Sequence, residues 1–495
     1  MTPPPGHQFG VGVISLFTSL VLKAATSQRA AASVLQIVAC HIPGLERLPC
    51  ANSGRLWLMR LGLYELTREK VKADDWVWMM DHTVQLGPWK CLVIVGVRLS
   101  AWNPERGPLK HEDLTLFNLT PMERSTGEAV AEQLQATIQQ TEIVPVAVLS
   151  DEGAELKTGM ELLQQRRPEA GNVAHVHDIK HKVATLLKKE LHDDETWQSF
   201  VTKTNRTKLQ VTLTSLAFLV PPSLKNKARY MNLDTLVNWG SRALTFLDDP
   251  RDFPGQPIDR DKLEQKLGWL REYREPLSRW AELLEVGEAA VAHVRAEGYH
   301  RSALEGLEET LTPLARAPAS LRLKTGLLTF VAGQSQHLPK GQHLPGSTEV
   351  LESLLGKYKR IQGAHSKGGM TGALLNIGAT LLEKTPAVIN KALATVRVDD
   401  VTQWLRDKLG MTIPAQQALA LRQNKNVPQT QTHSKQPTRR VPTTPQMRKL
   451  LFGRPLPSEH FRFAMLLRLP VLPRQAVPQK EDACHDAGGE DRAEG

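Results

Sequence analysis

The sequence predicts an α/β protein in which helices pack on a mixed β-sheet and a long helical segment follows the sheet. Two short apolar runs, Trp76–Met80 and Cys91–Val97, flank a Gly-Pro turn, which is typical of a β-hairpin. Between residues 125 and 191, helical periodicity alternates with further short, valine-rich runs. From residue 193 to 343 strand signals nearly vanish and Leu-rich helical patterns dominate. Together these patterns indicate strands and helices in one layered unit.

Composition sets the outer limits of the interpretation. The chain has 495 residues, of which 41% are hydrophobic and 23% charged, as is usual for a globular protein. These values exclude wholesale disorder, a collagen-like chain and a polytopic membrane protein, and the length allows two to four domains. The 62 Lys and Arg against 52 Asp and Glu leave a formal charge of +10, which favours polyanionic partners. The four cysteines are too scattered for a disulfide scaffold or a CxxC metal site, so we expect free thiols in a reducing cytosol.

Residues 1–72 are predicted to form a helical region. Its apolar periodic segments are Val13–Ala25, Arg29–Val38 and Ser53–Leu66. The stretch Val11–Leu22 lacks the basic start of a signal peptide and is too short to span a membrane, so we expect a buried helix. Because Arg55 and Arg60 make the third helix basic, the region fits a helix-turn-helix module that binds DNA. A plain helical cap on the next domain is the alternative.

Residues 73–192 carry the predicted sheet. After the hairpin, a helix is expected over Ser125–Thr141, and then a strand over Ile143–Leu149 that starts at Val146 if Pro145 is excluded. A helix over Ala154–Arg166, a strand over Val173–Val176 and a helix over Lys180–Leu191 follow. The predicted order is therefore ββαβαβα.

The remaining chain divides into three parts. Residues 193–343 are long enough for an all-α domain of their own. Residues 344–415 contain the amphipathic segment Ser347–Lys359, a Gly-rich turn at Gly363–Gly369, an apolar helix at Thr371–Leu382 and a last helix at 399–413. Residues 416–495 form a tail whose stretch Arg422–Arg454 has eight Lys and Arg and no acid, and which is acidic from Glu481 onward. This composition predicts disorder.

Three carboxylates stand at positions that favour chemistry. Asp81 ends one apolar strand and Asp151 follows another, and the ends of strands in such sheets are where ligands gather. Glu352 lies on the helix Ser347–Lys359, where Lys359, seven residues later, shares its face. Three carboxylates brought together form a hard-oxygen site for Mg²⁺ or Mn²⁺. Two such ions can activate water or a 3′-hydroxyl for attack on a phosphodiester.

Each of these residues also has a structural interpretation. Asp151 could cap the helix that begins at Ala154, and Asp81 could be a solvated residue of the hairpin. Glu352 and Lys359 could be surface charges of an amphipathic helix. Asp178, between a strand and a helix, is a fourth candidate and is better explained as an N-cap.

Three sequence blocks carry a family resemblance. They are Asp81-His82-Thr83 after a Trp/Met strand, Val148–Gly153 around Asp151, and Glu352–Lys359. In this order they resemble the signature blocks of bacterial insertion-sequence DDE transposases, whose catalytic core is RNase H-like and is shared with retroviral integrases. Asp151 and Glu352 lie 201 positions apart, and many members of that superfamily carry an insertion domain at this place.

The resemblance implies an RNase H-like core formed by residues 73–192 and 344–415, with residues 193–343 inserted. It implies a DNA transposase that cuts transposon ends at terminal inverted repeats and joins the 3′-hydroxyl to target DNA. Asp81, Asp151 and Glu352 would hold two Mg²⁺ or Mn²⁺ ions, while Arg55, Arg60, Lys357 and Lys359 would contact DNA. It further implies a homodimer on DNA, no membrane, and a nucleoid-associated protein of the bacterial cytoplasm.

Some alternatives stay open at this stage. Glu349 rivals Glu352 as the third carboxylate, and Glu352 is preferred for its partner Lys359. The Tyr-Arg-Glu-Lys signature of one transposase group is not cleanly present, because Tyr273-Arg274-Glu275 falls in the helical segment. A metal-dependent nuclease of the same fold and a catalytically inactive DNA-binding derivative are the rival functions.

Overall fold

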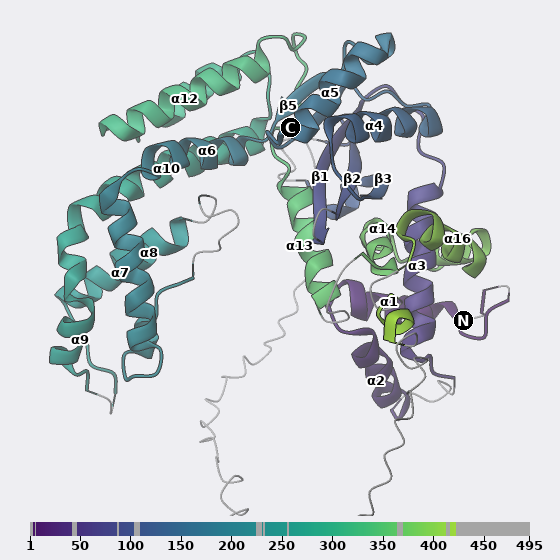
Figure 1. Ribbon diagram of the computed structural model, residues 1–495, viewed down its shortest axis with the longest axis horizontal. Helices are drawn as coiled ribbons and strands as arrows, with labels where there is room; N and C mark the ends of the chain where they lie inside the picture. Colours follow the sequence, from purple (N-terminus) through teal and green to yellow (C-terminus); the bar gives the residue numbers. More distant parts are fainter. Residues whose placement is uncertain are drawn as a thin grey trace, which may run out of the picture. The chain divides into compact units, whose positions relative to one another are not determined.

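The computed structural model describes most of the chain up to residue 421 (Figure 1). The described residues are 3–4, 6–41, 47–86, 89–102, 109–223, 230, 233–254, 257–363, 370–411 and 416–421. The predicted Gly-rich turn after Gly363 and the tail beyond residue 421 lie outside them, as does Cys484. Residues up to Asn426 belong to one compact unit.

A five-stranded mixed sheet lies at the centre of the fold. Its strands are β1 (Trp76–Leu86), β2 (Trp89–Arg98), β3 (Thr115–Met122), β4 (Ala147–Ser150) and β5 (Ala174–His177), in the order β3-β2-β1-β4-β5. The pairs β1–β2 and β2–β3 are antiparallel, whereas β1–β4 and β4–β5 are parallel. The α/β class, the hairpin and the two later strands are thus confirmed.

One strand was absent from the sequence prediction. The order is βββαβαβα, because β3 lies at the sheet edge between the hairpin and the first long helix. Its sequence contains Asn118 and Pro121, which weaken a strand pattern, but an edge strand tolerates a proline. Proline also explains why β4 begins only at Ala147, after Pro145.

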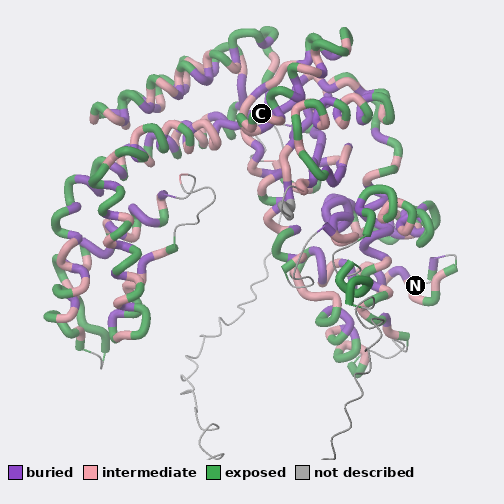
Figure 2. Tube along the Cα trace, viewed as in Figure 1, coloured by how far each residue is buried: buried purple, intermediate pink, exposed green. Residues whose placement is uncertain are grey.

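The two faces of the sheet are both buried and pack on different partners (Figure 2). Trp76, Trp78 and Met80 of β1 point to the face covered by α4 (Gly127–Thr141) and α5 (Ala154–Arg166). Val77 and Met79 alternate onto the opposite face and join the larger core. Helix α13 (Glu349–Gly363) contacts β1 and contributes Leu351, Leu354, Leu355 and Tyr358 to that larger core.

The N-terminal helices pack against helices from the end of the described chain. They are α1 (Val11–Leu22), α2 (Gln28–Ala39) and α3 (Ala51–Thr67), close to the predicted positions, and α1 buries Ile14, Phe17 and Val21. Helix α3 contacts β3, the 3₁₀ turn η7 (Gly372–Leu375), α14 (Asn376–Leu381), α15 (Pro386–Thr395) and α16 (Val398–Leu409). The sequence prediction merged η7 and α14 into one helix and missed α15.

Residues 193–343 are helical, as predicted. They form α7 (Glu195–Val211), α8 (Asp234–Asp248), α9 (Arg260–Leu267), α10 (Arg274–Glu297), α11 (Ala303–Leu311) and α12 (Pro318–Ser335). Trp280 is buried among Trp197, Phe200 and Tyr273. Helices α10 and α12 contact α6 (Ile179–Leu191), the helix that follows β5. Among the described helices, none is long and apolar enough to cross a membrane.

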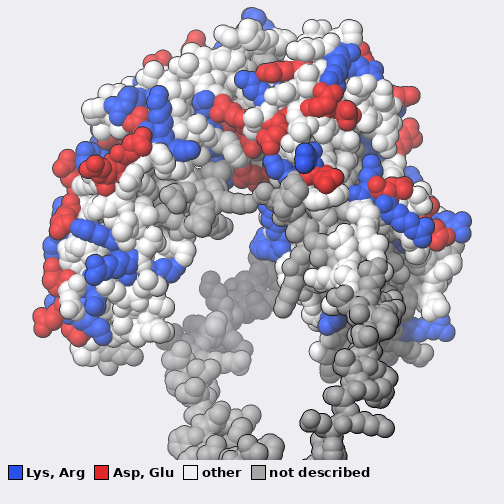
Figure 3. All heavy atoms as spheres, viewed as in Figure 1, with Lys and Arg blue, Asp and Glu red and all other residues white. Residues whose placement is uncertain are grey.

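Charges of both signs are spread over the described surface. On the face drawn in Figure 3, Lys and Arg side chains are interspersed with Asp and Glu. Several are paired, such as Arg271 with Asp248 and Glu264, and Arg322 with Glu190. Pairs of this kind near the surface contribute little to stability.

Candidate carboxylate site

The register of the parallel strands places three acidic residues side by side. Met80 of β1 is paired with Ser150 of β4, and Ser150 is paired with His177 of β5. Asp81, Asp151 and Asp178 each follow one residue later. Asp151 and Asp178 lie just past the ends of β4 and β5, whereas Asp81 lies inside β1, paired with Val93, so the prediction that Asp81 ends a strand was wrong: the hairpin strand continues to Leu86. Since neighbouring strands lie about 4.8 Å apart, the row brings the three backbones close together. Asp81 and Asp151, 70 positions apart in sequence, therefore become neighbours.

Helix α13 brings Glu352 to the same region. Side chains alternate along a strand, so Asp81 points to the face of Val77 and Met79, which is the face that α13 contacts. Glu352 lies in the first turn of α13, and its side chain is 28% exposed. The fold thus brings the charge of a residue from beyond the helical segment 193–343 to act on Asp81.

The charges of two other carboxylates act on Asp81. Burial raises the pKa of Asp81 to about 6, and the negative charges of Asp151 and Glu352 contribute to the rise. The backbone N–H of His82, which donates to Asp81 Oδ1 at 2.6 Å, and the nearby His181 oppose it. Like charges and desolvation both disfavour an ionised carboxylate. A cation bound beside Asp81 would therefore stabilise its ionised form.

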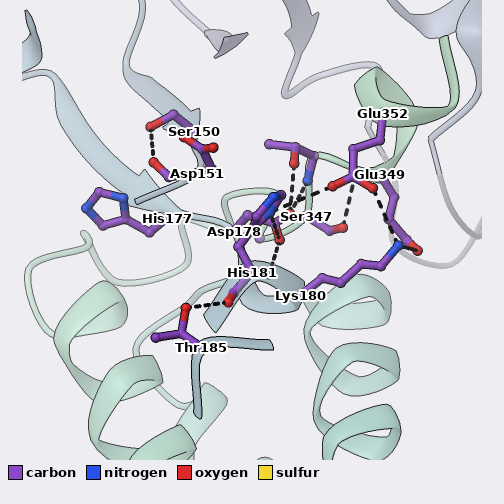
Figure 4. A network of polar contacts seen from close by, with 12 residues as sticks. Ser150, Asp151, His177, Asp178, Lys180, His181, Thr185, Ser347, Glu349 and Glu352 are labelled. Atoms are coloured by element: carbon purple, nitrogen blue, oxygen red, sulfur yellow. Dashed lines mark hydrogen bonds and ion pairs between the residues drawn. The ribbon is translucent and has the colours of Figure 1, made fainter. Parts of the chain in front are cut away.

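Two cationic side chains of α6 contact Glu352 (Figure 4). Lys180 Nζ lies 3.4 Å from Glu352 Oε2, and His181 Nδ1 lies 3.7 Å from Glu352 Oε1. Burial disfavours the charged imidazole, but the hydrogen bond and charge of Asp178, with the charges of Glu352 and Asp151, raise the pKa of His181 to about 9. His181 is therefore a cation at neutral pH, and the acidic cluster is partly neutralised by the protein itself.

Glu349, the rival third carboxylate, is held differently. Its Oε1 lies 3.2 Å from Lys180 Nζ, and its Oε2 lies 2.8 Å from Arg295 Nε on α10. The charge of Glu352 is among the causes that raise the pKa of Asp81. Position thus favours Glu352 over Glu349 as the partner of the two aspartates.

Asp178 and Asp151 bind the backbone differently. Asp178 is fully buried and caps α6, as predicted, by accepting from His181 N–H at 2.8 Å. Asp151 does not cap α5, whose N-cap is Gly153 without a side-chain hydrogen bond; its Oδ1 accepts from Gly153 N–H at 3.0 Å, in the turn before the helix. Because a carboxylate has two acceptor oxygens, Asp151 Oδ2 could bind a further donor or a cation.

The donor set suits a hard divalent ion, but the side chains do not enclose one. Carboxylate oxygens are the ligands that Mg²⁺ and Mn²⁺ prefer, and mutual repulsion within the cluster would be relieved by a cation. Within the described ranges, no group of three or more His, Cys, Asp or Glu side chains is arranged so that it could hold a metal. An ion would have to compete with Lys180 and His181 for Glu352.

The residues predicted to bind DNA lie in different environments. Arg55 on α3 and Lys359 on α13 are exposed, and Lys357 is half-buried. Arg60 is 9% exposed, and its guanidinium donates to the backbone carbonyls of Leu393 and Val396. This guanidinium joins α3 to the end of α15, so we assign Arg60 a structural role in place of the predicted DNA contact.

A cavity of about 740 Å³ lies beside Glu352. It is lined by charged and polar side chains of both signs and by Trp102; the charged ones and histidine are Lys110, His111, Glu112, Lys180, Arg295, Glu349 and Glu352. A ligand in this cavity would therefore meet Glu352, and the lining residues do not include Asp81 or Asp151.

Sequence reasoning did not single out Lys180 and His181 as part of this site. The signal that could have found them is their position, two and three residues after the predicted N-cap Asp178, at the end of a strand parallel to that of Asp151. That they contact Glu352 could not be predicted without knowing where α13 packs.

No protein-family model matches the chain, and no curated protein matches it.

Proposed function

We propose that this protein is a DDE-type DNA transposase with an RNase H-like core. One arrangement supports the proposal. Asp81 and Asp151 come directly after Met80 and Ser150, which are paired on adjacent parallel strands, and the charge of Glu352 on α13 helps to raise the pKa of Asp81. Aspartates on two adjacent strands and a helix-borne glutamate beyond a helical insertion are the arrangement that the family resemblance implies. The basic balance of the chain agrees with a DNA substrate.

Each acidic residue has a defined part in the proposed chemistry. Asp81, Asp151 and Glu352 would hold divalent ions, which, when bound, activate a water or a 3′-hydroxyl and stabilise the leaving oxygen. The largely buried Asp81 is the residue whose ionisation depends most on such an ion. Arg55 and Lys359 remain exposed for phosphate contacts, and Lys357 lies beside Arg360 in a region of positive charge. Binding of two DNA ends would require a second copy of the chain.

The first experiment measures the metal site directly. Mn²⁺ binding is followed by electron paramagnetic resonance for the parent protein and for Asp81→Asn, Asp151→Asn and Glu352→Gln. We expect each substitution to weaken Mn²⁺ binding by at least about tenfold, because a ligand is lost. Glu349→Gln and Glu152→Gln are matched controls, since they remove neighbouring carboxylates that pair with Arg295 and Lys182. Equal loss in the controls would reject the assignment.

The second experiment measures the reaction. The substrate is a plasmid carrying the DNA that flanks the coding sequence on both sides, incubated with Mg²⁺ or Mn²⁺. We expect cleavage at the ends of the flanking repeats and joining of the 3′-ends to a second plasmid, both abolished by Asp81→Asn. Cleavage without joining would favour the nuclease, and binding without cleavage would favour an inactive DNA-binding derivative.

A further inference from the structure

A short segment at the end of β5 contacts the start of α13 residue by residue. Ile179 N–H donates to the carbonyl of Gly346 at 3.0 Å. Asp178 Oδ2 accepts from both Thr348 N–H, at 2.5 Å, and Thr348 Oγ1, at 3.0 Å. Lys180 then contacts Glu349 and Glu352, and His181 contacts Glu352. Figure 4 shows these side chains gathered between α6 and α13.

The chain entering α13 is held on its other side as well. Tyr299 forms an isolated β-bridge with Leu344, and its hydroxyl donates to the carbonyl of His177 at 2.7 Å. A side chain at Gly346 would collide with Val294 and Tyr299, so the backbone passes closely there. The return of the chain from the helical segment is therefore fixed to the end of β5 before α13 begins.

Asp178 is the centre of this junction. It is fully buried, and its two oxygens serve different elements: Oδ1 binds the backbone and ring of His181 on α6, and Oδ2 binds Thr348 one residue before α13. A helix cap alone needs only one acceptor oxygen. The bonds from Thr348 to Asp178 Oδ2 are therefore not needed for capping α6, and they join α6 to the start of α13.

We propose that Asp178 is a positioning residue that sets the place of Glu352 in the carboxylate site. It acts through Thr348, from which α13 begins, and through the His181 ring, which contacts Glu352. Partners of this kind fix the orientation of metal ligands without binding the metal themselves. The assignment rests on the proposed metal site, and it adds a residue that the family resemblance did not supply.

The test begins with Asp178→Asn. Asparagine caps helices about as well as aspartate, but it offers a single acceptor oxygen and cannot serve both Thr348 and His181. We expect Mn²⁺ binding to weaken about 10- to 100-fold, and amide hydrogen exchange in the first turn of α13 to accelerate. Asp194→Asn, which changes the N-cap of α7, is the matched control and should leave both quantities unchanged.

A double-mutant cycle distinguishes positioning from a general loss of structure. If Asp178 acts through Glu352, Asp178→Asn added to Glu352→Gln should weaken Mn²⁺ binding no further. An equal loss in both backgrounds, or Mn²⁺ binding and exchange unchanged by Asp178→Asn, would overturn the proposal. If Glu352→Gln itself leaves Mn²⁺ binding unchanged, the proposed function fails, whereas exchange in α13 still decides whether Asp178 positions this helix.

A second pair of variants covers the case in which Asp178→Asn does not fold. Thr348→Val removes only the hydroxyl bond to Asp178 and keeps the backbone bond, and Thr348→Ser keeps both. We expect a smaller loss of Mn²⁺ binding, up to about tenfold, for the valine variant and parent behaviour for the serine variant. Equal binding by the two variants would then overturn the proposal.

Discussion

Burial and repulsion by neighbouring carboxylates act together on the side chain of Asp81. Asp81 lies within the strand β1, its carboxyl accepts one backbone N–H, and the charges of two other carboxylates act on it. Removing such a group from water is costly unless a partner neutralises it. The cost appears as a pKa raised from 3.8 to about 6.

This raised pKa predicts how stability depends on pH. The folded state binds the proton of Asp81 more tightly than the unfolded state, so ionisation penalises folding fully above about pH 6 and not at all below 3.8. Asp81→Asn should therefore raise the free energy of unfolding by about 2–3 kcal/mol at pH 7.5 without metal, and by almost nothing at pH 4. Urea unfolding in EDTA at the two pH values measures this.

The control for Asp81 is an exposed acid. Glu161→Gln on α5 should change stability by less than about 0.5 kcal/mol at either pH. A gain from Asp81→Asn of the same size at pH 4 and pH 7.5 would show that packing, and not charge, explains it.

At the level of helices, close backbone packing joins α3 to the C-terminal helices. A Cβ at Gly62 would lie 1.8 Å from the carbonyl oxygen of Leu375, and a Cβ at Gly378 would lie 2.7 Å from the carbonyl oxygen of Gly62. The backbone of α3 therefore passes so close to that of η7 and α14 that a side chain at Gly62 or Gly378 would collide with it. The glycines in the apolar pattern of α3 thus mark a helix crossing, which could not be recognised before its partner was known.

Gly62→Ala tests this crossing. We expect it to lower the free energy of unfolding by about 2–3 kcal/mol, because the backbone of η7 must shift. Gly356→Ala, on α13, is the matched control: a Cβ there meets nothing within 4 Å, so alanine should stabilise by up to about 1 kcal/mol. Thermal and urea unfolding compare the two variants, and a neutral Gly62→Ala would contradict the close packing.

In the whole molecule, the N-terminal helices pack against the last helices of the described chain. Helices α1 to α3 and α14 to α16 contact one another, and Arg60 links positions 333 residues apart by donating to Leu393. Its Nε donates to the carbonyl of Val396 at 2.6 Å, so one guanidinium satisfies two carbonyls at the end of α15. The N-terminal helices are therefore bound into the same packed unit as the helices that follow α13.

Exchanging arginines on α3 separates stability from DNA binding. Arg60→Met should lower the free energy of unfolding by about 2–3 kcal/mol, because two buried carbonyls lose a charged donor. Arg55→Met should leave stability within about 0.5 kcal/mol and, if it contacts a phosphate, reduce the salt dependence of DNA binding by about one ion. Urea unfolding and salt titrations of DNA binding measure both. A stable Arg60→Met protein with weakened DNA binding would reverse the assignment.

Local patterns in the sequence were sufficient for most elements. Apolar runs and helical periodicity predicted the hairpin, β4, β5 and the helices from α4 to α6 within a few residues, because these signals depend on neighbours in the chain. β3 and α15 escaped, since an edge strand with Pro121 and a short helix carry weak local signals.

The site divides in the same way. The sequence by itself determined that Asp151 follows a strand and that Glu352 lies on an amphipathic helix, whereas the expectation that Asp81 ends a strand was wrong, because β1 continues to Leu86. Only the tertiary structure decided that the charges of Asp151 and Glu352 act on Asp81, that Lys180 and His181 contact Glu352, and that Arg60 is buried. The physical reason is that strand ends follow from short-range patterns. Which side chains meet across 201 residues depends instead on strand register and helix packing, which no local pattern contains.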